Sequence, residues 1–383
     1  MSQPTTRLLL LGAGHAHAQV LRSWARQPVA GVDLVVVSPS ALAPYSGMVP
    51  GWLAGACRFD EICIDFAALA HAAGARFIAD EVVALDARGQ TATLASGATL
   101  GWDWLSLNLG STLAPPADLG VPVLALRPLG RLQAAWDACL AAQAGNRSPR
   151  PLRLMAVGGG AAGFEALLAA RARLLALQPG RPLQATLLSR GPALLPGLAA
   201  GAVRAAHRAL ARAGVQLRLG AACTPAQAAG HDLVLWATGA QAHAWQSDPA
   251  RRGGLAASAD GFIAVDAQLR SVSHPRVFAV GDCAAFSPAL PKAGVYAVRM
   301  GPVLTAQLRA ALGGTQDDAP APAYHPQPRH LVLLATGDGR AIASRGPLWA
   351  EGRWVWRWKN HIDRGFLAGF HQHSALAAGS GAG

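Results

Sequence analysis

The chain has 383 residues, more than one hydrophobic core usually organises, so two or three structural units are expected. Hydrophobic residues make up 52% of it and charged residues 14%, with 43 Gly and 26 Pro, which excludes a disordered chain and favours an α/β protein with many turns. The net charge of +12 comes mostly from scattered arginines without a nucleic-acid-binding motif, so no nucleic-acid partner is expected.

The cysteines and the N-terminal apolar run bear on the compartment. Residues 8–11 are too short a run for a signal peptide or a membrane span. We therefore expect a cytoplasmic protein. The five cysteines are Cys57, Cys63, Cys139, Cys223 and Cys283. They show no CxxC or CxxxxC spacing, so the sequence predicts neither a redox-active cysteine pair nor a metal site.

The first glycine loop lies near the start of the chain. Gly12 and Gly14 follow an apolar strand over residues 7–11 and precede a helix through residue 24, after which residues 32–37 form a second strand. A GxG turn of this kind lets backbone N–H groups approach a pyrophosphate at a helix N-terminus. The loop therefore predicts a dinucleotide site on the first unit.

Two positions of this unit depart from the usual pattern. His17 stands where a third glycine is usual, so the helix and the strand should pack less closely. Ser38 follows the second strand at the place of the acid that usually binds the ribose, and its hydroxyl is a weaker substitute. Asp33 lies at the wrong end of that strand and is interpreted as a solvated residue.

The second glycine loop keeps all three glycines, Gly158, Gly160 and Gly163, between a strand over residues 152–157 and a helix over residues 164–177. It predicts the site of a second nucleotide. At its ribose position Ser189 and Arg190 stand where an acid would exclude a 2′-phosphate, which favours NADP. A solvated loop arginine is the alternative interpretation.

Short strands complete both units. Residues 82–86, 91–94 and 104–108 are expected to form a small β excursion and a return strand. Later in the chain, Gly239 ends an Ala-Thr-Gly turn, and Gly281 and Asp282 follow the strand over residues 276–280. A carboxylate at that strand end can accept hydrogen bonds from a ribityl chain.

The order of these motifs resembles the FAD-dependent pyridine nucleotide-disulfide oxidoreductase superfamily, and more closely its type II NADH dehydrogenases and sulfide:quinone reductases. The resemblance covers residues 7–305 and depends on the stretches GxGxxx, GGGxxGxE, ATG and VFAVGDCA. Within it, residues 14–17, 38–39, 44–48 and 291–299 are similar to the subgroup fused to, or encoded with, selenide, water dikinase. The missing CxxxxC pair makes disulfide reduction an unexpected activity.

The resemblance implies an α/β fold, a tandem Rossmann-like flavoprotein with a small C-terminal α+β tail. FAD is expected on residues 1–120 with 260–312, and NAD(P)H on residues 121–259, followed by a tail over residues 313–383. Cofactor contacts are expected from Gly12, Gly14, His15, Ser38, Gly281, Asp282, Gly158, Gly160, Gly163, Ser189, Arg190 and Gly239.

Two residues are expected at the reacting centre. Glu165 matches the acid that lies near the flavin and nicotinamide in type II NADH dehydrogenases. Lys292, with the helix that begins near Gly294, would lie by the pyrimidine end of the flavin, where positive charge stabilises the reduced ring. A helix-surface Glu and a solvated Lys are the alternatives.

The C-terminal tail concentrates aromatic and basic residues after a linker over residues 312–328 and a strand over residues 330–334. Trp354, Trp356 and Trp358 alternate as in a strand, whereas Ile362, Phe366 and Phe370 follow at the four-residue spacing of a helix. Such a mixture over residues 352–370 is suited to peripheral contact with a membrane at its inner face, and a tail that packs in the core or forms a homodimer contact explains it equally well.

The expected function is an FAD-dependent NAD(P)H dehydrogenase in which hydride passes from the nicotinamide to the flavin and electrons leave to a quinone-like acceptor. The alternative is a flavin-binding accessory or redox-sensing protein of selenium metabolism with little steady turnover.

Overall fold

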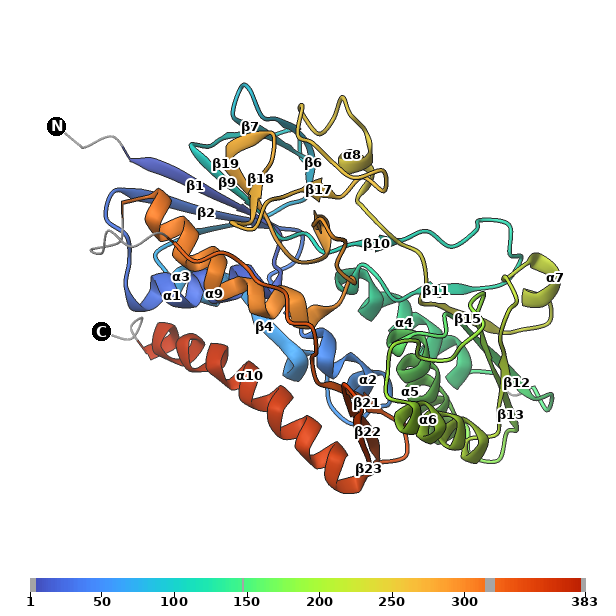
Figure 1. The fold of residues 1–383 in the computed structure, drawn as a ribbon. Helices are drawn as coiled ribbons and strands as arrows, with labels where there is room; N and C mark the ends of the chain where they lie inside the picture. Colours follow the sequence, from blue (N-terminus) through green and yellow to red (C-terminus); the bar gives the residue numbers. More distant parts are fainter. Residues whose placement is uncertain (1–4, 147, 314–320, 380–383) are drawn as a thin grey trace.

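The computed structural model describes residues 5–146, 148–313 and 321–379, and side chains as far as residue 371. Two parallel sheets organise it (Figure 1). The first has the order β18-β19-β9-β1-β2-β5, and the second has the order β11-β15-β12-β13-β14. A three-stranded sheet, β21-β22-β23, precedes the long C-terminal helix α10 (Arg353–Gly379).

The first sheet is centred on β1 (Thr6–Leu11), which pairs in parallel with β2 (Val32–Ser38) and β9 (Trp104–Leu107). Alternate residues of β1 enter two cores, since successive strand side chains point to opposite faces. Leu8 and Leu10 pack with α1 (His15–Arg26) and α9 (Gly294–Ala311), and Leu9 and Leu11 pack on the other face. That face is covered by β6 (Val82–Asp86), β7 (Thr91–Leu94) and β8 (Thr99–Gly101). The outer strands are β5 (Arg76–Ala79), β18 (Arg270–Ser271) and β19 (His274–Ala279).

The second sheet repeats this plan. Its central strand β12 (Leu152–Val157) pairs in parallel with β13 (Leu183–Leu188) and β15 (Leu233–Trp236), and α5 (Ala161–Leu177) packs on one face. Further elements are α4 (Leu129–Ala144), α6 (Ala200–Arg212), β11 (Val123–Ala125) and β14 (Val215–Arg218). A ribbon of β10 (Thr112–Leu113) and β16 (Ala240–Gln241) joins the two units.

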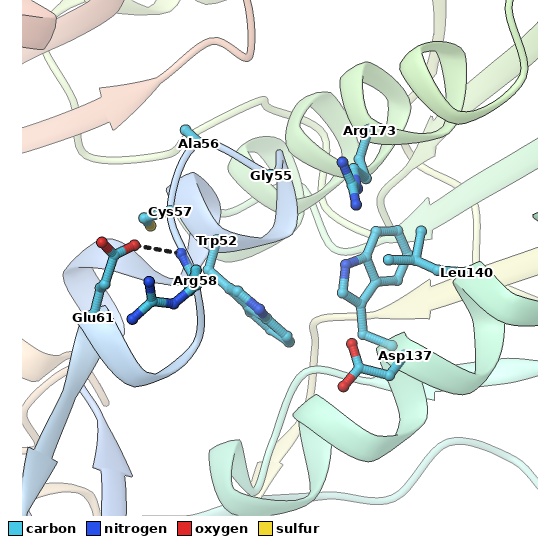
Figure 2. Close-up of a pocket in the computed structure, with 10 residues that line it drawn as sticks. Trp52, Gly55, Ala56, Cys57, Arg58, Glu61, Asp137, Leu140 and Arg173 are labelled. Atoms are coloured by element: carbon cyan, nitrogen blue, oxygen red, sulfur yellow. Dashed lines mark hydrogen bonds between the residues drawn. The ribbon is translucent and has the colours of Figure 1, made fainter.

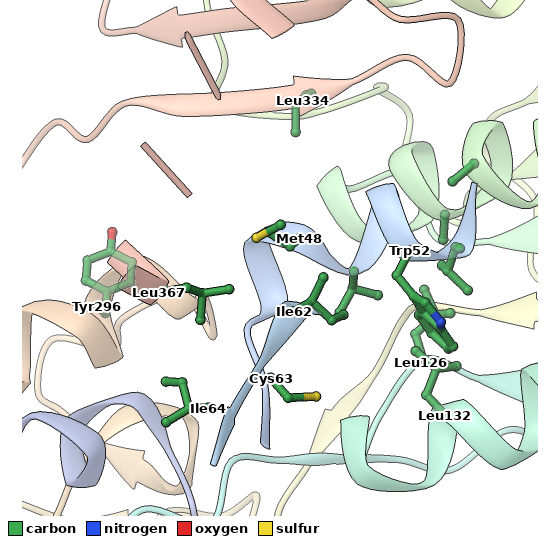
Figure 3. Close-up of a cluster of buried hydrophobic side chains, with 14 of the residues drawn as sticks. Met48, Trp52, Ile62, Cys63, Ile64, Leu126, Leu132, Tyr296, Leu334 and Leu367 are labelled. Atoms are coloured by element: carbon green, nitrogen blue, oxygen red, sulfur yellow. The ribbon is translucent and has the colours of Figure 1, made fainter. Parts of the chain in front are cut away.

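One apolar cluster runs between the units and the C-terminal elements (Figure 3). Met48 and Trp52 of the segment that includes α2 (Val49–Leu53) lie there with Leu126, which follows β11. Leu334 and Leu367 enter it from β21 (Val332–Ala335) and α10. The C-terminal elements are therefore part of the core.

The strand expected at Trp354, Trp356 and Trp358 is wrong, because α10 begins at Arg353. Helical spacing is satisfied instead by the buried Val355 and Leu367, which the period-two tryptophans concealed. The hairpin of β22 (Ala341–Arg345) and β23 (Leu348–Gly352) was not expected at all. Part of the expected linker, residues 314–320, lies outside the described residues.

Candidate functional site

The first glycine loop joins β1 to α1. Gly12 has φ +100°, and a Cβ there would lie 2.5 Å from the carbonyl oxygen of Asn108. Gly14 has an ordinary extended φ of −84°, but a Cβ would lie 2.2 Å from Cγ of Asn108. Both glycines are thus required by the close approach of Asn108, a residue that the motif did not indicate.

Asn108 ties this loop to the end of β19. Its Oδ1 accepts hydrogen bonds from the N–H groups of Ala16 (3.1 Å) and His17 (3.2 Å), and its Nδ2 donates to the Val280 carbonyl (3.1 Å). Within the described chain, the N–H groups of Gly14 and His15 have no acceptor. Orphan N–H groups at a helix N-terminus attract an anion, so the loop fits a pyrophosphate.

His17 is fully buried between α1 and β9. Its Nδ1 lies 2.7 Å from the Gly12 carbonyl and its Nε2 lies 2.9 Å from the Ser106 hydroxyl. Burial lowers the pKa of His17 to about 4, so the ring is neutral at physiological pH. The imidazole thus fills the place of the third glycine with both of its ring nitrogens hydrogen-bonded.

Asp282 lies where a ribityl-binding carboxylate is expected, after β19, and its side chain is 14% exposed. Arg127 donates to it at 2.5 Å and also donates to the Ser111 hydroxyl and the Lys292 carbonyl. No sequence motif indicated Arg127, because it lies in the segment just before α4, outside the glycine loops and the other motifs. Gly281, with φ +68°, faces the Asn108 amide, which a Cβ would approach to 2.8 Å.

Lys292 lies just before α9, and its Nζ donates to the Ala284 carbonyl at 2.6 Å. The ammonium also lies 3.7 Å from the centre of the Phe262 ring. Burial lowers the pKa of Lys292. Ser38, the expected ribose contact, is 5% exposed at the end of β2, and Asp33 is paired with Arg7 at 2.7 Å.

The second glycine loop joins β12 to α5. Gly158 has φ +130°, and a Cβ on Gly163 would lie 2.0 Å from the Gly158 carbonyl oxygen, so the third glycine brings the helix close to the turn. A Cβ on Gly160 would meet nothing within 4 Å. In the described structure the N–H groups of Gly160 and Ala161 lack an acceptor. This loop therefore also fits a pyrophosphate.

Ser189 and Arg190 follow β13 beside this loop. Ser189 is buried, and a Cβ on Gly159 would lie 2.7 Å from its Oγ, which places the hydroxyl against the loop. Arg190 is exposed. Gly239, with φ +75°, follows β15, the strand beside β12.

Glu165 is the fifth residue of α5, two residues after Gly163, and its Oε1 accepts a hydrogen bond from the Ala335 N–H of β21 at 2.7 Å. Loss of hydration raises the pKa of Glu165 to about 7, against the opposing charge of Lys359 on α10. Glu165 is therefore a half-buried residue held against β21, and a carboxyl group with a raised pKa lies two residues after the second glycine loop.

His15, the residue after Gly14, meets two aromatic rings. Its ring lies 5.4 Å from that of Tyr45 and 6.1 Å from that of Phe366 on α10. Burial lowers its pKa to about 4, opposed by the charge of Asp282. The C-terminal helix thus reaches the first nucleotide loop, a contact that the sequence did not predict.

A pocket in the described structure lies away from both glycine loops. It has a volume of about 440 Å³ and is lined by Trp52, Cys57 and Trp136 among others (Figure 2). It contains none of the expected site residues. We therefore base the site on the loops. Among the described residues no His, Cys, Asp and Glu group could hold a metal ion, and no helix has the length and apolarity to cross a membrane.

Comparison with known proteins identifies relatives of the whole tandem unit. The model of the family described as pyridine nucleotide-disulphide oxidoreductase matches residues 6–306. An NADH dehydrogenase-like protein of Mycobacterium tuberculosis is 27% identical over 308 residues, covering 73% of each chain. Its description mentions no link to selenium, so resemblance to the selenide, water dikinase subgroup stays a prediction.

Solved structures share the fold at low identity. The sulfide:quinone oxidoreductase of Aquifex aeolicus superposes with a TM-score of 0.75 at 15% identity, covering 96% of this chain and 92% of that one. NDH2 of Plasmodium falciparum, solved with NADH, gives a TM-score of 0.73 at 11% identity, covering 96% and 98%. The prediction of a tandem Rossmann-like fold is confirmed.

Proposed function

The chain belongs to the pyridine nucleotide-disulphide oxidoreductase family and is a flavin-dependent pyridine nucleotide oxidoreductase, and we propose that it passes electrons from NAD(P)H through FAD to a quinone-like acceptor. The observation that carries the proposal is the pair of glycine loops with orphan N–H groups at the N-termini of α1 and α5. The NADH dehydrogenase-like relative and the sulfide:quinone oxidoreductase fold support the same reaction class.

In this proposal, residues 1–120 with 260–312 hold FAD, and residues 121–259 hold the nicotinamide nucleotide. The loop Gly12 to His15 binds the FAD pyrophosphate, and Asp282, oriented by Arg127, binds the ribityl chain. Lys292, held by the Ala284 carbonyl, places positive charge before α9. The second loop, with Ser189, Arg190 and Gly239, binds NAD(P)H.

FAD, when bound, would supply the acceptor for a hydride from the nicotinamide and the source of two electrons and one proton for the electron acceptor. Reduction of a quinone to its dihydroxy form consumes two electrons and two protons, so one more proton must be taken up, from solvent directly or through an acidic side chain. Glu165 can donate it, because its pKa of about 7 keeps a protonated fraction at neutral pH. The carboxylate then regains a proton from water.

Stopped-flow absorbance tests the proposal. NADPH or NADH should bleach the flavin, and a soluble quinone should restore its colour. Because only protonated Glu165 donates, the quinone step should slow as pH rises through about 7. Glu165→Gln should slow it about 100-fold or more and leave flavin reduction unchanged. A colourless protein that takes up no FAD, or a flavin that quinones never reoxidise, would contradict the proposal.

Arg190 decides the choice of nucleotide. Its exposed guanidinium stands where an acid would repel a 2′-phosphate, and a charge-assisted hydrogen bond to a phosphate contributes about 1.5–3 kcal/mol. NADPH should be used at least as well as NADH. Arg190→Ala should raise the apparent KM for NADPH about tenfold or more in steady-state assays and leave that for NADH unchanged. An equal change for both nucleotides would exclude Arg190 from phosphate recognition.

A further inference from the structure

A buried ion pair on α10 faces the segment that follows β2. Lys359 and Asp363 stand one helical turn apart, and their side chains are each 8% exposed. Lys359 Nζ lies 2.7 Å from Asp363 Oδ2 and donates a second hydrogen bond to the Gly47 carbonyl at 2.5 Å. A buried pair of this kind costs desolvation and is retained where it has partners on both sides.

The second partner of Asp363 is Tyr45. Burial, together with the charge and hydrogen bonding of Asp363, raises the pKa of the Tyr45 hydroxyl. A Cβ on Gly47 would lie 2.7 Å from the Tyr45 ring and 3.0 Å from Asp363 Oδ1. The Tyr45 ring also lies 5.4 Å from the ring of His15 in the first glycine loop, in an edge-to-face arrangement. The Asp363 carboxylate thus orders both Lys359 and the segment beside His15.

The cluster also lies near Glu165 of α5, because Glu165 Oε1 accepts a hydrogen bond from the Ala335 N–H of β21 at 2.7 Å and β21 packs against α10. The ionisable groups that shift the pKa of Glu165 are Lys359, which lowers it, and Asp363, which raises it. The neighbouring elements α2 and β21 carry no ionisable side chain, and those of α4 (Arg131, Asp137 and Cys139) do not perturb it. Lys359 makes its ion pair with Asp363 and not with Glu165.

We propose that Asp363 is a positioning residue for proton donation by Glu165, because it binds the Lys359 ammonium and so keeps Glu165 from forming the ion pair that would hold its carboxyl ionised. The inference rests on the proposed function for its consequence in turnover. The pKa of the Glu165 carboxyl group, however, can be measured without turnover.

Two variants should shift the pKa of Glu165 in opposite directions. Asp363→Asn removes the negative charge and frees Lys359 to pair with Glu165, so the pKa of Glu165 should fall by about one unit or more. Lys359→Met removes the positive charge, so the pKa of Glu165 should rise by about one unit, whether or not Asp363 stays ionised. A structural defect alone would not move the two variants in opposite directions.

The direct measurement is infrared spectroscopy of the flavin-loaded protein as a function of pH. The protonated carboxyl stretch that disappears in Glu165→Gln identifies Glu165. We expect its midpoint at lower pH in Asp363→Asn and at higher pH in Lys359→Met. Glu351→Gln is the matched control, because Glu351 pairs with Arg208 at 2.9 Å on the C-terminal hairpin away from this cluster.

Stopped-flow reoxidation by a soluble quinone gives the second readout. The alkaline limit of the quinone step should move with the infrared midpoint, whereas flavin reduction by NADPH should not change. If Asp363→Asn does not fold, Asp363→Ser removes the same charge and should lower the midpoint in the same way. Unmoved midpoints in folded variants would overturn the inference. Midpoints that move as expected in a protein that reduces no quinone would support it and contradict the proposed function.

Discussion

The two glycine loops should tolerate different substitutions, because different side chains surround their glycines. Around Gly14 the space is taken by Asn108, which hydrogen-bonds Ala16, His17 and Val280 and so ties two ends of the first sheet together. Around Gly160 there is open space. The same motif glycine is therefore required by packing in the first loop, whereas no contact among the described residues requires it in the second.

Valine at the two positions should give a crossed pattern. Gly14→Val displaces Asn108 and should abolish FAD binding with a loss of stability, whereas Gly160→Val should stay yellow and resist reduction by NAD(P)H. Flavin absorbance after gel filtration and anaerobic stopped-flow reduction measure the two properties. The reverse pattern would mean that the cofactors occupy the opposite loops.

His17 makes stability depend on pH. Its pKa is about 4 in the folded chain against an ordinary value near 6.5, so the unfolded state binds the proton first as pH falls. The apoprotein should lose about 3 kcal/mol through His17 alone as pH drops from 6.5 to 4. Urea unfolding at pH 7 and 4.5 should show a smaller difference for His17→Gln than for the wild type. The exposed His361 gives the control, His361→Gln, whose pH dependence should match the wild type.

At the scale of elements, α10 has two faces. The inner face carries Val355, Lys359, Asp363 and Leu367, all buried. The outer face presents Trp354, Trp358 and Ile362, which are 57%, 39% and 39% exposed, beside exposed arginines. Figure 1 shows this helix running along one side of the molecule. Aromatic rings flanked by basic groups are suited to the interface of an anionic bilayer.

Replacing both outer tryptophans should therefore weaken membrane binding. We expect Trp354→Ser with Trp358→Ser to lower the affinity for vesicles containing anionic lipid about tenfold or more in sedimentation assays, with flavin content unchanged. Val272→Ser, at an exposed apolar residue that is 61% accessible on the first unit, should have no effect. If the double variant instead dissociates a dimer and binds vesicles normally, the face is a subunit contact.

For the whole molecule, the C-terminal elements connect both nucleotide units. Trp349 of β23 packs on α6 so closely that a Cβ on Gly201 would lie 1.9 Å from its indole nitrogen. The Ser344 hydroxyl accepts from the Ala199 N–H at 3.0 Å in the same interface. On the other side, α10 contacts α1 and α3 (Phe66–Ala72) of the first unit. The C-terminal elements therefore pack against both units and also form part of the surface.

Gly201→Ala should weaken the packing of β23 against α6. The added methyl group must displace Trp349, which should lower the free energy of unfolding by about 1–3 kcal/mol in denaturant titrations. Gly130→Ala is the matched control, because Gly130 also lies in a helix and a Cβ there meets nothing within 4 Å. Equal stability of the two variants would show that the hairpin repacks without cost.

The amino-acid sequence by itself determined the features that depend on neighbours along the chain. Gly12 and Gly158 mark turns with positive φ after apolar strands, and period-two and 3.6-residue patterns placed β1, β12, α1 and α5. The order of these motifs was enough to predict a tandem fold. Whether each predicted residue contacts a cofactor stays a prediction.

The tertiary structure alone decided which distant residues complete the loops. Asn108, Arg127 and the Lys359–Asp363 pair are each far in sequence from the glycines or the carboxylates they serve, and no local periodicity marks them. The tryptophans of α10 show the same limit. Trp354 and Trp358 belong to an alternating pattern, but they are also four residues apart and so share one exposed face of the helix. Contacts between segments hundreds of residues apart arise only when the sheets and helices pack, and here that packing brought the C-terminal helix to the first glycine loop.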